Sequence, residues 1–136
     1  MTTEIPVEAE EISIRGFNRF VGPLYRLPDK AERPRFAFVA AEKHMNAAGR
    51  VHGGMLITLA DVAMSRTARL TSKATSCSTV SLSCDFLAPG RLGETIEAEV
   101  RVTRLARTMV FLSAEITASG RPLLVANGVW RVRHAE

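Results

Sequence analysis

The sequence has few cysteines and no cysteine motif. It contains only Cys77 and Cys84, and no Cys-x-x-Cys pair is present. In a regular strand these two residues would lie on opposite faces and about 23 Å apart, so they could not form a disulfide with each other. We expect both thiols to be reduced and buried, as is usual inside cells.

Long hydrophobic runs and a secretory signal are also missing. No apolar stretch approaches the roughly 18 residues that a membrane-spanning helix needs. The N-terminus Met1-Thr2-Thr3-Glu4 has neither a basic start nor an apolar core. Together with 46% hydrophobic and 24% charged residues in a chain of 136, this predicts a single soluble domain in the cytoplasm, without membrane association.

Positive charge is absent from the first 14 residues, which hold Glu4, Glu8, Glu10 and Glu11. The chain as a whole is nevertheless basic, with a net charge of +4, and most of its basic residues are Arg. These arginines are scattered, without a basic run or interleaved aromatic residues, so we expect no nucleic-acid partner. A phosphorylated small molecule fits the charge equally well.

The chain divides by composition near residue 33. Residues 1–33 contain three of the six prolines and predict an irregular or briefly helical segment, whereas residues 34–136 form the main domain. A strand is expected over residues 35–41, followed by a loop that continues to Arg50.

One long helix is predicted from Gly53 to about Thr71, because the segment lacks proline and its apolar residues recur every three or four positions. The polar residues Thr58, Asp61, Ser65 and Arg69 form a single stripe on it. Most of the helix surface must therefore be covered by other parts of the chain.

Alternating patterns after Ser76 predict four strands joined by short turns. In the first of them, Val80, Leu82, Cys84 and Phe86 form the apolar face. The last, Leu123 to Arg133, is apolar on both faces and is placed inside the sheet. The expected class is α+β, with a mostly antiparallel sheet of five to six strands packed against one long helix.

Several catalytic motifs are missing. The chain has no Gly-x-x-x-x-Gly-Lys phosphate loop and no Gly-x-Ser-x-Gly elbow. Its three histidines, His44, His52 and His134, have no second ligand at helix or loop spacing, so no protein-bound metal is expected.

The segment from His44 to Asp61 is the remaining candidate site. Gly53 and Gly54 leave backbone N–H groups unhindered at a helix start, where an oxyanion or carbonyl oxygen could be held. Asp61 is the only carboxylate in the helix. Alternatively, the glycines form only a close packing contact and Asp61 is a solvated member of the polar stripe.

Taken together, these residues resemble the hotdog-fold acyl-coenzyme A thioesterases of the phenylacetate-pathway type. The matching motif is Asn46, His52-Gly53-Gly54, and Asp61 eight residues after the first Gly. The similarity continues through Thr79 and the segment Phe86 to Glu94, and covers roughly residues 35 to 133. It implies a sheet wrapped around one central helix and an acyl-coenzyme A substrate, without a cofactor.

The resemblance also implies a role for each matching residue. The Gly53 N–H and the Asn46 side chain would hold the thioester carbonyl, and Asp61 would act as base or nucleophile. A hydroxyl at Thr79 would orient water, although Thr is also simply a good strand residue. His52 would either support the loop by a hydrogen bond or help to polarise the substrate.

Further substrate contacts are expected from Gly54 and from three arginines in or near predicted turns: Arg91, Arg104 and Arg107. The arginines are candidates for contacting the phosphates of coenzyme A. Asp85 and Glu115 are expected to lie on solvated strand faces.

Spacing along the helix constrains the assembly. Eight helical residues separate Gly53 from Asp61 by about 12 Å, whereas an oxyanion donor and a base must both lie within about 3 Å of the reacting groups. One site would therefore combine Gly53 of one subunit with Asp61 of another, which makes the protein an obligate homo-oligomer with paired sites. We expect at least a dimer, and a homotetramer built as a dimer of dimers.

The expected activity is hydrolysis of an acyl-coenzyme A thioester, with Asp61 either activating water or attacking the carbonyl itself. Two alternatives remain. A non-catalytic acyl-coenzyme A binding or regulatory protein could share the fold, but it would not need a base opposite an oxyanion site. A dehydratase acting on hydroxyacyl thioesters is disfavoured, because its usual His-bearing, Pro-rich segment ahead of the helix is missing.

Overall fold

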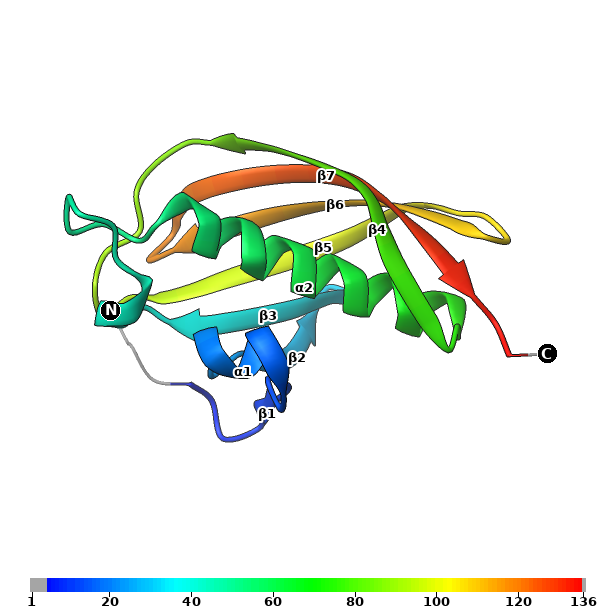
Figure 1. Ribbon diagram of the computed structural model, residues 1–136, viewed down its shortest axis with the longest axis horizontal. Coiled ribbons are helices and arrows are strands. Elements are labelled where there is room, and N and C mark those ends of the chain that lie inside the picture. Colours follow the sequence, from blue (N-terminus) through cyan, green and yellow to red (C-terminus); the bar gives the residue numbers. More distant parts are fainter. Residues whose placement is uncertain (1–4, 136) are drawn as a thin grey trace.

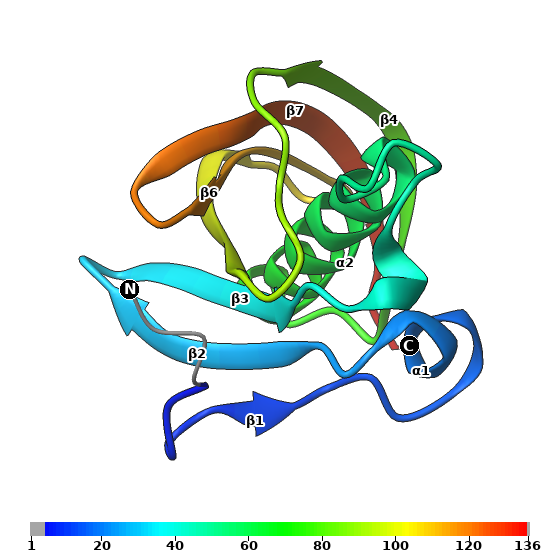
Figure 2. The same cartoon turned by 90° about the vertical axis from the view of Figure 1, so that its left-hand side faces the viewer.

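An antiparallel sheet of seven strands curves around one long helix in the computed structural model, which describes residues 5–135 (Figures 1 and 2). Met1 to Glu4, and so one glutamate of the acidic cluster, lie outside the described residues. The strands are β1 (Glu10–Glu11), β2 (Tyr25–Lys30), β3 (Arg33–Val39), β4 (Ser76–Phe86), β5 (Thr95–Leu105), β6 (Met109–Ala118) and β7 (Arg121–Arg133). The helices are α1 (Gly16–Val21), the short 3-10 helix η1 (Glu42–His44) and α2 (Gly53–Ser72).

The helix α2 confirms the prediction from the apolar spacing. It buries the residues expected to face the sheet, namely Leu56, Leu59, Ala60, Ala63, Met64 and Ala68, together with Met55 and Thr67. The alanines keep that face narrow, so the strands can approach closely. The helix ends at Lys73, whose left-handed backbone (φ 58°) directs its N–H to the carbonyls of Arg69 and Leu70.

The sheet order is β1-β2-β3-β5-β6-β7-β4, and every pair of neighbours is antiparallel. β7 lies between β6 and β4, which confirms that the last strand is internal. β4 lies at the edge beyond β7, and its connection to β5 passes across the end of the sheet (Figure 2). Within residues 5–135, β4 therefore has a strand neighbour on only one side.

Two strands were not predicted. The short helix expected before residue 33 is α1, but β1 and β2 from the same segment extend the sheet to seven strands. Pro28 lies inside β2, and a proline in the sequence argues against a strand. The strand tolerates it because β2 lies near the edge of the sheet. The β2–β3 hairpin crosses the boundary placed near residue 33.

A bulge in β4 corrects the prediction for its two faces. Thr79 pairs with Trp130 and Ser81 with the adjacent Val129, so Val80 is an extra residue. Val80 is 56% exposed and does not belong to the helix-facing side as predicted.

The same bulge places both cysteines on one face, not on opposite faces. Cys77 and Cys84 both pack against the core and are free thiols. Burial raises the pKa of each thiol, which keeps it protonated and unreactive.

No helix within residues 5–135 is both long enough and apolar enough to span a membrane.

Candidate functional site

The N-terminus of α2 presents one free backbone donor. His52 is the N-cap residue, and its Nδ1 accepts the N–H of Gly54 at 2.8 Å, so the ring proton is on Nε2. The N–H of Gly53 has no acceptor among the hydrogen bonds of residues 5–135. Gly53 is thus the donor at this helix end that remains available to a ligand.

Both glycines are also in close contact with side chains. A Cβ at Gly53 would lie 3.1 Å from the ring of Phe86, and one at Gly54 would lie 2.9 Å from Nδ1 of His52. Close packing and an accessible N–H therefore occur together at Gly53. Phe86 was not among the sequence candidates, and only its place as the first residue of the matching segment Phe86 to Glu94 could have indicated it.

Asn46 organises the loop before α2. Its Oδ1 accepts the N–H groups of Ala48 and Arg50, each at 3.0 Å, in a turn that only a short side chain with an acceptor can form. These contacts orient the amide so that Nδ2 carries the remaining hydrogen-bond donors. Asn46 is exposed, so a ligand could reach them.

Asp61 and Thr79 meet within one chain. The Thr79 hydroxyl donates to Oδ1 of Asp61 at 2.7 Å, which fixes the carboxylate and leaves Oδ2 without a partner in the described structure. The β4 bulge is what lets Thr79 face α2 together with Leu82, because in a regular strand of the same residues these two, three positions apart, would face opposite sides.

Gly53 and Asp61 do not meet within one chain. They are separated by uninterrupted helix in α2, which corresponds to about 12 Å along its axis. Gly53, Ile57 and Asp61 follow one another at steps of four and so lie in one row. β4 runs beside this row, since Phe86 contacts Gly53 and Thr79 contacts Asp61.

The three candidate arginines fall at two places. Arg91 is in the β4–β5 loop, near the start of α2, because the adjacent Gly90 accepts the N–H of Val51. Arg104 lies in β5 near the tip of the β5–β6 hairpin, and Arg107 lies in the turn that connects the two strands. One chain therefore does not bring Arg91 together with the other two.

Arg107 belongs to a basic hollow of about 390 Å³ that it shares with Arg131, Arg133 and His134. None of these arginines forms an ion pair within the part of the chain that is described. Guanidinium groups without a carboxylate partner that line one hollow can bind a phosphate.

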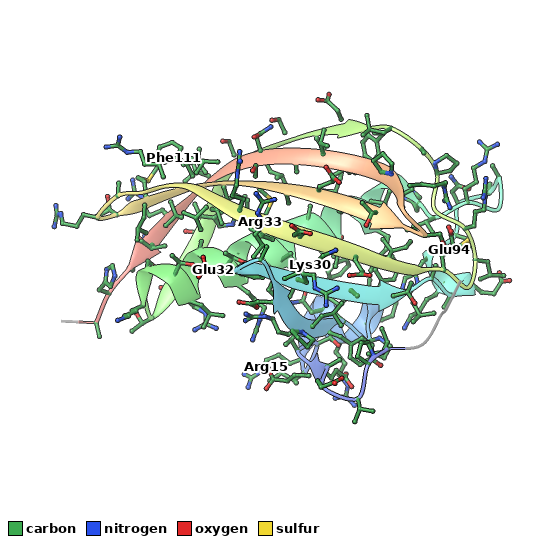
Figure 3. All side chains as sticks on the ribbon, turned by 180° about the vertical axis from the view of Figure 1, so that it is seen from behind. Arg15, Lys30, Glu32, Arg33, Glu94 and Phe111 are labelled. Carbon is green, nitrogen blue, oxygen red and sulfur yellow. The ribbon has the colours of Figure 1, made fainter. Side chains whose placement is uncertain are left out.

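A buried ion pair supports the loops around the helix start. Glu94 is almost fully buried and accepts two hydrogen bonds from Arg121, at 2.7 and 3.0 Å, as well as the N–H of Arg91 at 2.8 Å. It lies where β5 begins, at one end of the sheet (Figure 3). These hydrogen bonds, Arg121 first, lower the pKa of Glu94 to about 2 despite its burial.

His44 holds α1 against the rest of the chain. Its Nδ1 accepts the N–H of Ala41 at 2.9 Å, so Nε2 donates to the carbonyl of Val21 at 2.6 Å. Burial lowers its pKa, which keeps the ring neutral. The sequence offered no sign of this role, because the contact with Val21 depends on the tertiary fold.

Two carboxylates expected on solvated strand faces, Asp85 and Glu115, are exposed on their strands. Within residues 5–135, no group of three or more His, Cys, Asp or Glu side chains is arranged to hold a metal ion.

Known proteins resemble this chain over most of its length. A Pseudomonas aeruginosa protein named as an esterase is 33% identical over 113 residues, which is 82% of this chain and 84% of that protein. Human acyl-coenzyme A thioesterase 13 is 26% identical over 114 residues, 84% of this chain and 81% of that protein.

Solved structures share the fold at lower identity. The PaaI protein of the E. coli phenylacetic acid degradation operon superposes with a TM-score of 0.72 at 20% identity, covering 80% of this chain and 78% of that one. A Streptococcus mutans protein bound to acetyl coenzyme A gives a TM-score of 0.76 at 21% identity, covering 90% and 95%.

The family profile of the thioesterase superfamily matches residues 48–125, which include α2, β4 and most of the strands that surround them. This match covers more than half of the chain. The protein therefore belongs to the thioesterase superfamily, and its sheet around a central helix is the hotdog fold.

Proposed function

We propose that this protein hydrolyses an acyl-coenzyme A thioester to a carboxylate and free coenzyme A. The observation that carries the proposal is the carboxylate of Asp61, which Thr79 holds through one oxygen while the other stays free. A fixed carboxylate with a free oxygen suits a general base or a nucleophile. Membership of the thioesterase superfamily and similarity to an acyl-coenzyme A thioesterase support the same substrate class.

The complete site would form between two subunits. In two antiparallel helices related by a two-fold axis, Gly53 of one lies opposite Asp61 of the other when the axis passes beside the midpoint, Ile57. Ile57 is 36% exposed, although it is a large apolar residue. The unpaired edge of β4, with Val80 56% exposed, continues this surface, and long open strand edges of this kind are usually covered.

In such a site, the Gly53 N–H and the Asn46 amide would bind the thioester oxygen while water or Asp61 attacks the carbonyl carbon. The carbon–sulfur bond then breaks, the thiolate of coenzyme A leaves and takes up a proton, and the acyl group becomes a carboxylate. If Asp61 attacks directly, water hydrolyses the resulting anhydride in a second step. Both routes require the developing oxyanion to be stabilised at the helix start.

We propose that the phosphates of coenzyme A contact the arginines of the basic hollow, Arg107, Arg131 and Arg133, together with Arg104 and Arg91. We further propose that the protein is cytoplasmic, because the substrate is an intracellular metabolite class. The dimer is the smallest unit with complete active sites, and we propose a homotetramer assembled from two such dimers.

The experiment uses three variants. Asp61→Asn should lower kcat by about 100-fold or more, because an amide can neither accept the proton nor attack. Gly53→Pro removes the N–H at a helix position that tolerates proline. Gly53→Ala is its matched control, since it keeps the N–H and adds only a methyl group, 3.1 Å from the ring of Phe86, which is 54% exposed and so has room to shift.

Mixing then tests the shared site. When Asp61→Asn and Gly53→Pro chains are refolded together in equal amounts, half of the dimers combine both chains and have one intact site of two, so about a quarter of wild-type activity should return. No recovery from folded, mixed dimers would place both groups in one chain's site. Tight binding of acyl-coenzyme A without hydrolysis by the wild type would identify a non-catalytic binding protein instead.

A further inference from the structure

A cavity of about 260 Å³ opens beside the start of α2. α1 and η1 form one wall, with Phe17, Val21 and His44, and the first turns of α2 form the other, with Met55 and Thr58. Figure 2 shows α1 beside the end of α2 at which Gly53 lies. α1 buries none of its own residues, and Phe17 remains 62% exposed, so this aromatic residue is not there to fill the core.

The polar groups of the cavity wall are already engaged. Both ring nitrogens of His44 are hydrogen-bonded, and the Thr58 hydroxyl donates to the carbonyl of Gly54 at 2.8 Å. Nδ1 of His52 is also occupied. What remains for a ligand is apolar surface together with two donors, Nε2 of His52 and the exposed ammonium of Lys43, which also donates to the carbonyl of Phe20 at 3.3 Å.

The cavity adjoins the free N–H of Gly53, because the flanking residues His52 and Gly54 both line it. A thioester whose carbonyl oxygen is bound by the N–H of Gly53 would thus lie next to the cavity, since both neighbours of Gly53 line it. Apart from those two donors, the described wall offers a ligand only apolar surface, and burying a hydroxyl or carboxylate there without a partner is costly.

We infer that this cavity receives the acyl group of the substrate, and that it selects mainly apolar acyl groups of medium length, straight-chain or aryl. A volume of about 260 Å³ holds on the order of nine groups the size of a liquid water molecule, which corresponds to acyl groups of roughly six to nine carbon atoms. The inference rests on the proposed thioester hydrolysis and adds the class of acyl group to it. Phe17 is the specificity-determining residue, because it is the large side chain that α1 contributes to the wall.

The test compares two aromatic residues of α1. Phe17 lines the cavity, whereas Phe20 is 78% exposed and does not. Measured as kcat/KM, the preference of the wild type for octanoyl- over acetyl-coenzyme A should fall about five- to tenfold in Phe17→Ala, since part of a phenyl contact is lost. In Phe20→Ala the preference should stay within about twofold of the wild type, because the removed ring is outside the cavity.

A second variant works in the opposite direction. Phe17→Trp makes the cavity smaller, so the preferred acyl length in a series from acetyl- to palmitoyl-coenzyme A should become shorter. Binding of octanoyl-coenzyme A to Asp61→Asn, measured by calorimetry, should weaken when Phe17→Ala is added.

The outcomes separate the two proposals. If the wild type hydrolyses acyl-coenzyme A but Phe17→Ala and Phe20→Ala have the same length profile, the inference is wrong and the proposed function stands. If the wild type hydrolyses no acyl-coenzyme A, yet octanoyl-coenzyme A binding depends on Phe17, the acyl site stands and hydrolysis does not. A wild type that prefers palmitoyl- or acetyl-coenzyme A would also overturn the inference.

Discussion

Glu94 is a buried carboxylate whose charge is satisfied by a single forked partner. Arg121 binds both of its oxygens, and Ser119 and the backbone of Arg91 complete its hydrogen bonds. Arg121 also donates to the carbonyl of Pro89 at 2.9 Å. The β6–β7 turn is thereby tied to the loop whose Gly90 supports the chain just before α2.

Replacing Glu94 by Gln should therefore destabilise the protein. The pKa of Glu94 is about 2 in the folded state against an ordinary value of 4.5, so its ionised form contributes about 3 kcal/mol to the free energy of unfolding at neutral pH. Because the folded pKa is the lower one, this contribution is present above about pH 4.5 and is lost as the pH falls toward 2. Urea unfolding at pH 7 and at pH 3 measures the difference.

Glu97→Gln is the matched control for that change. Its ion pair with Arg35 is similarly short, at 2.6 Å, but it is partly exposed. Removing it should cost less than about 1 kcal/mol. A Glu94→Gln protein as stable as Glu97→Gln at pH 7 would contradict the account of Glu94.

At the scale of elements, the bulge in β4 determines which side chains reach α2. Cys77 and Thr79 precede the extra residue Val80, and Leu82 follows it, yet all of them face the helix. Removing Val80 would leave a regular strand with the same residues facing inward. Removing Ser78 instead would turn Cys77 outward.

Two one-residue deletions test this geometry. Deleting Val80 should leave the free energy of unfolding of the single chain within about 1 kcal/mol of the wild type and both thiols protected, because within one chain only the bulge and one half-exposed side chain are lost. Deleting Ser78 should expose Cys77 and cost about 1 to 3 kcal/mol. Reaction with a thiol reagent and urea unfolding report the two effects. Equal thiol reactivity in the two deletion variants would contradict the assigned bulge.

The bulge also shows where the sequence stops being informative. The period of apolar residues is enough to predict α2 and the later strands, since each pattern is set by burial of one face. The same period assigned Val80 to the wrong face of β4, because the residue types around a bulge do not distinguish it from a regular strand. β1 and β2 escaped prediction because Pro28 and the short length of β1 obscure any alternation.

The candidate site divides in the same way. Asn46, Gly53 and Asp61 could be selected from spacing and resemblance, whereas the contacts of Phe86 and His44 depend on chain segments that only the fold brings together. For His52 the sequence left two roles open, support by a hydrogen bond or polarisation of the substrate, and in the structure it caps α2 by accepting the N–H of Gly54, although the usual cap residues are Ser, Thr, Asp and Asn.

At the scale of the whole molecule, the proposed two-fold axis beside Ile57 can be tested without measuring activity. Ile57→Cys would place two thiols next to each other across the axis, so mild oxidation should yield a covalent dimer on a non-reducing gel. The native Cys77 and Cys84 are replaced by Ser in this experiment to prevent other disulfides.

Leu70→Cys in the same background is the control. Leu70 is 45% exposed on the same helix, but it lies about 20 Å along the axis from Ile57 and so would not meet its own copy. Cross-linking at Leu70 and not at Ile57 would exclude the proposed arrangement of the two subunits.

The place of β4 in the sheet has a consequence for how the protein is made on the ribosome. β4 ends at Phe86, but its strand partner β7 begins only at Arg121, after β5 and β6 have been synthesised. At about 5 to 20 residues per second, the nascent chain waits a few seconds with Thr79 and Asp61 made but β4 unpaired. Translation that stops early, even by the length of β7, would thus release a chain in which β4 is unpaired on both edges, which is a target for chaperones and proteases.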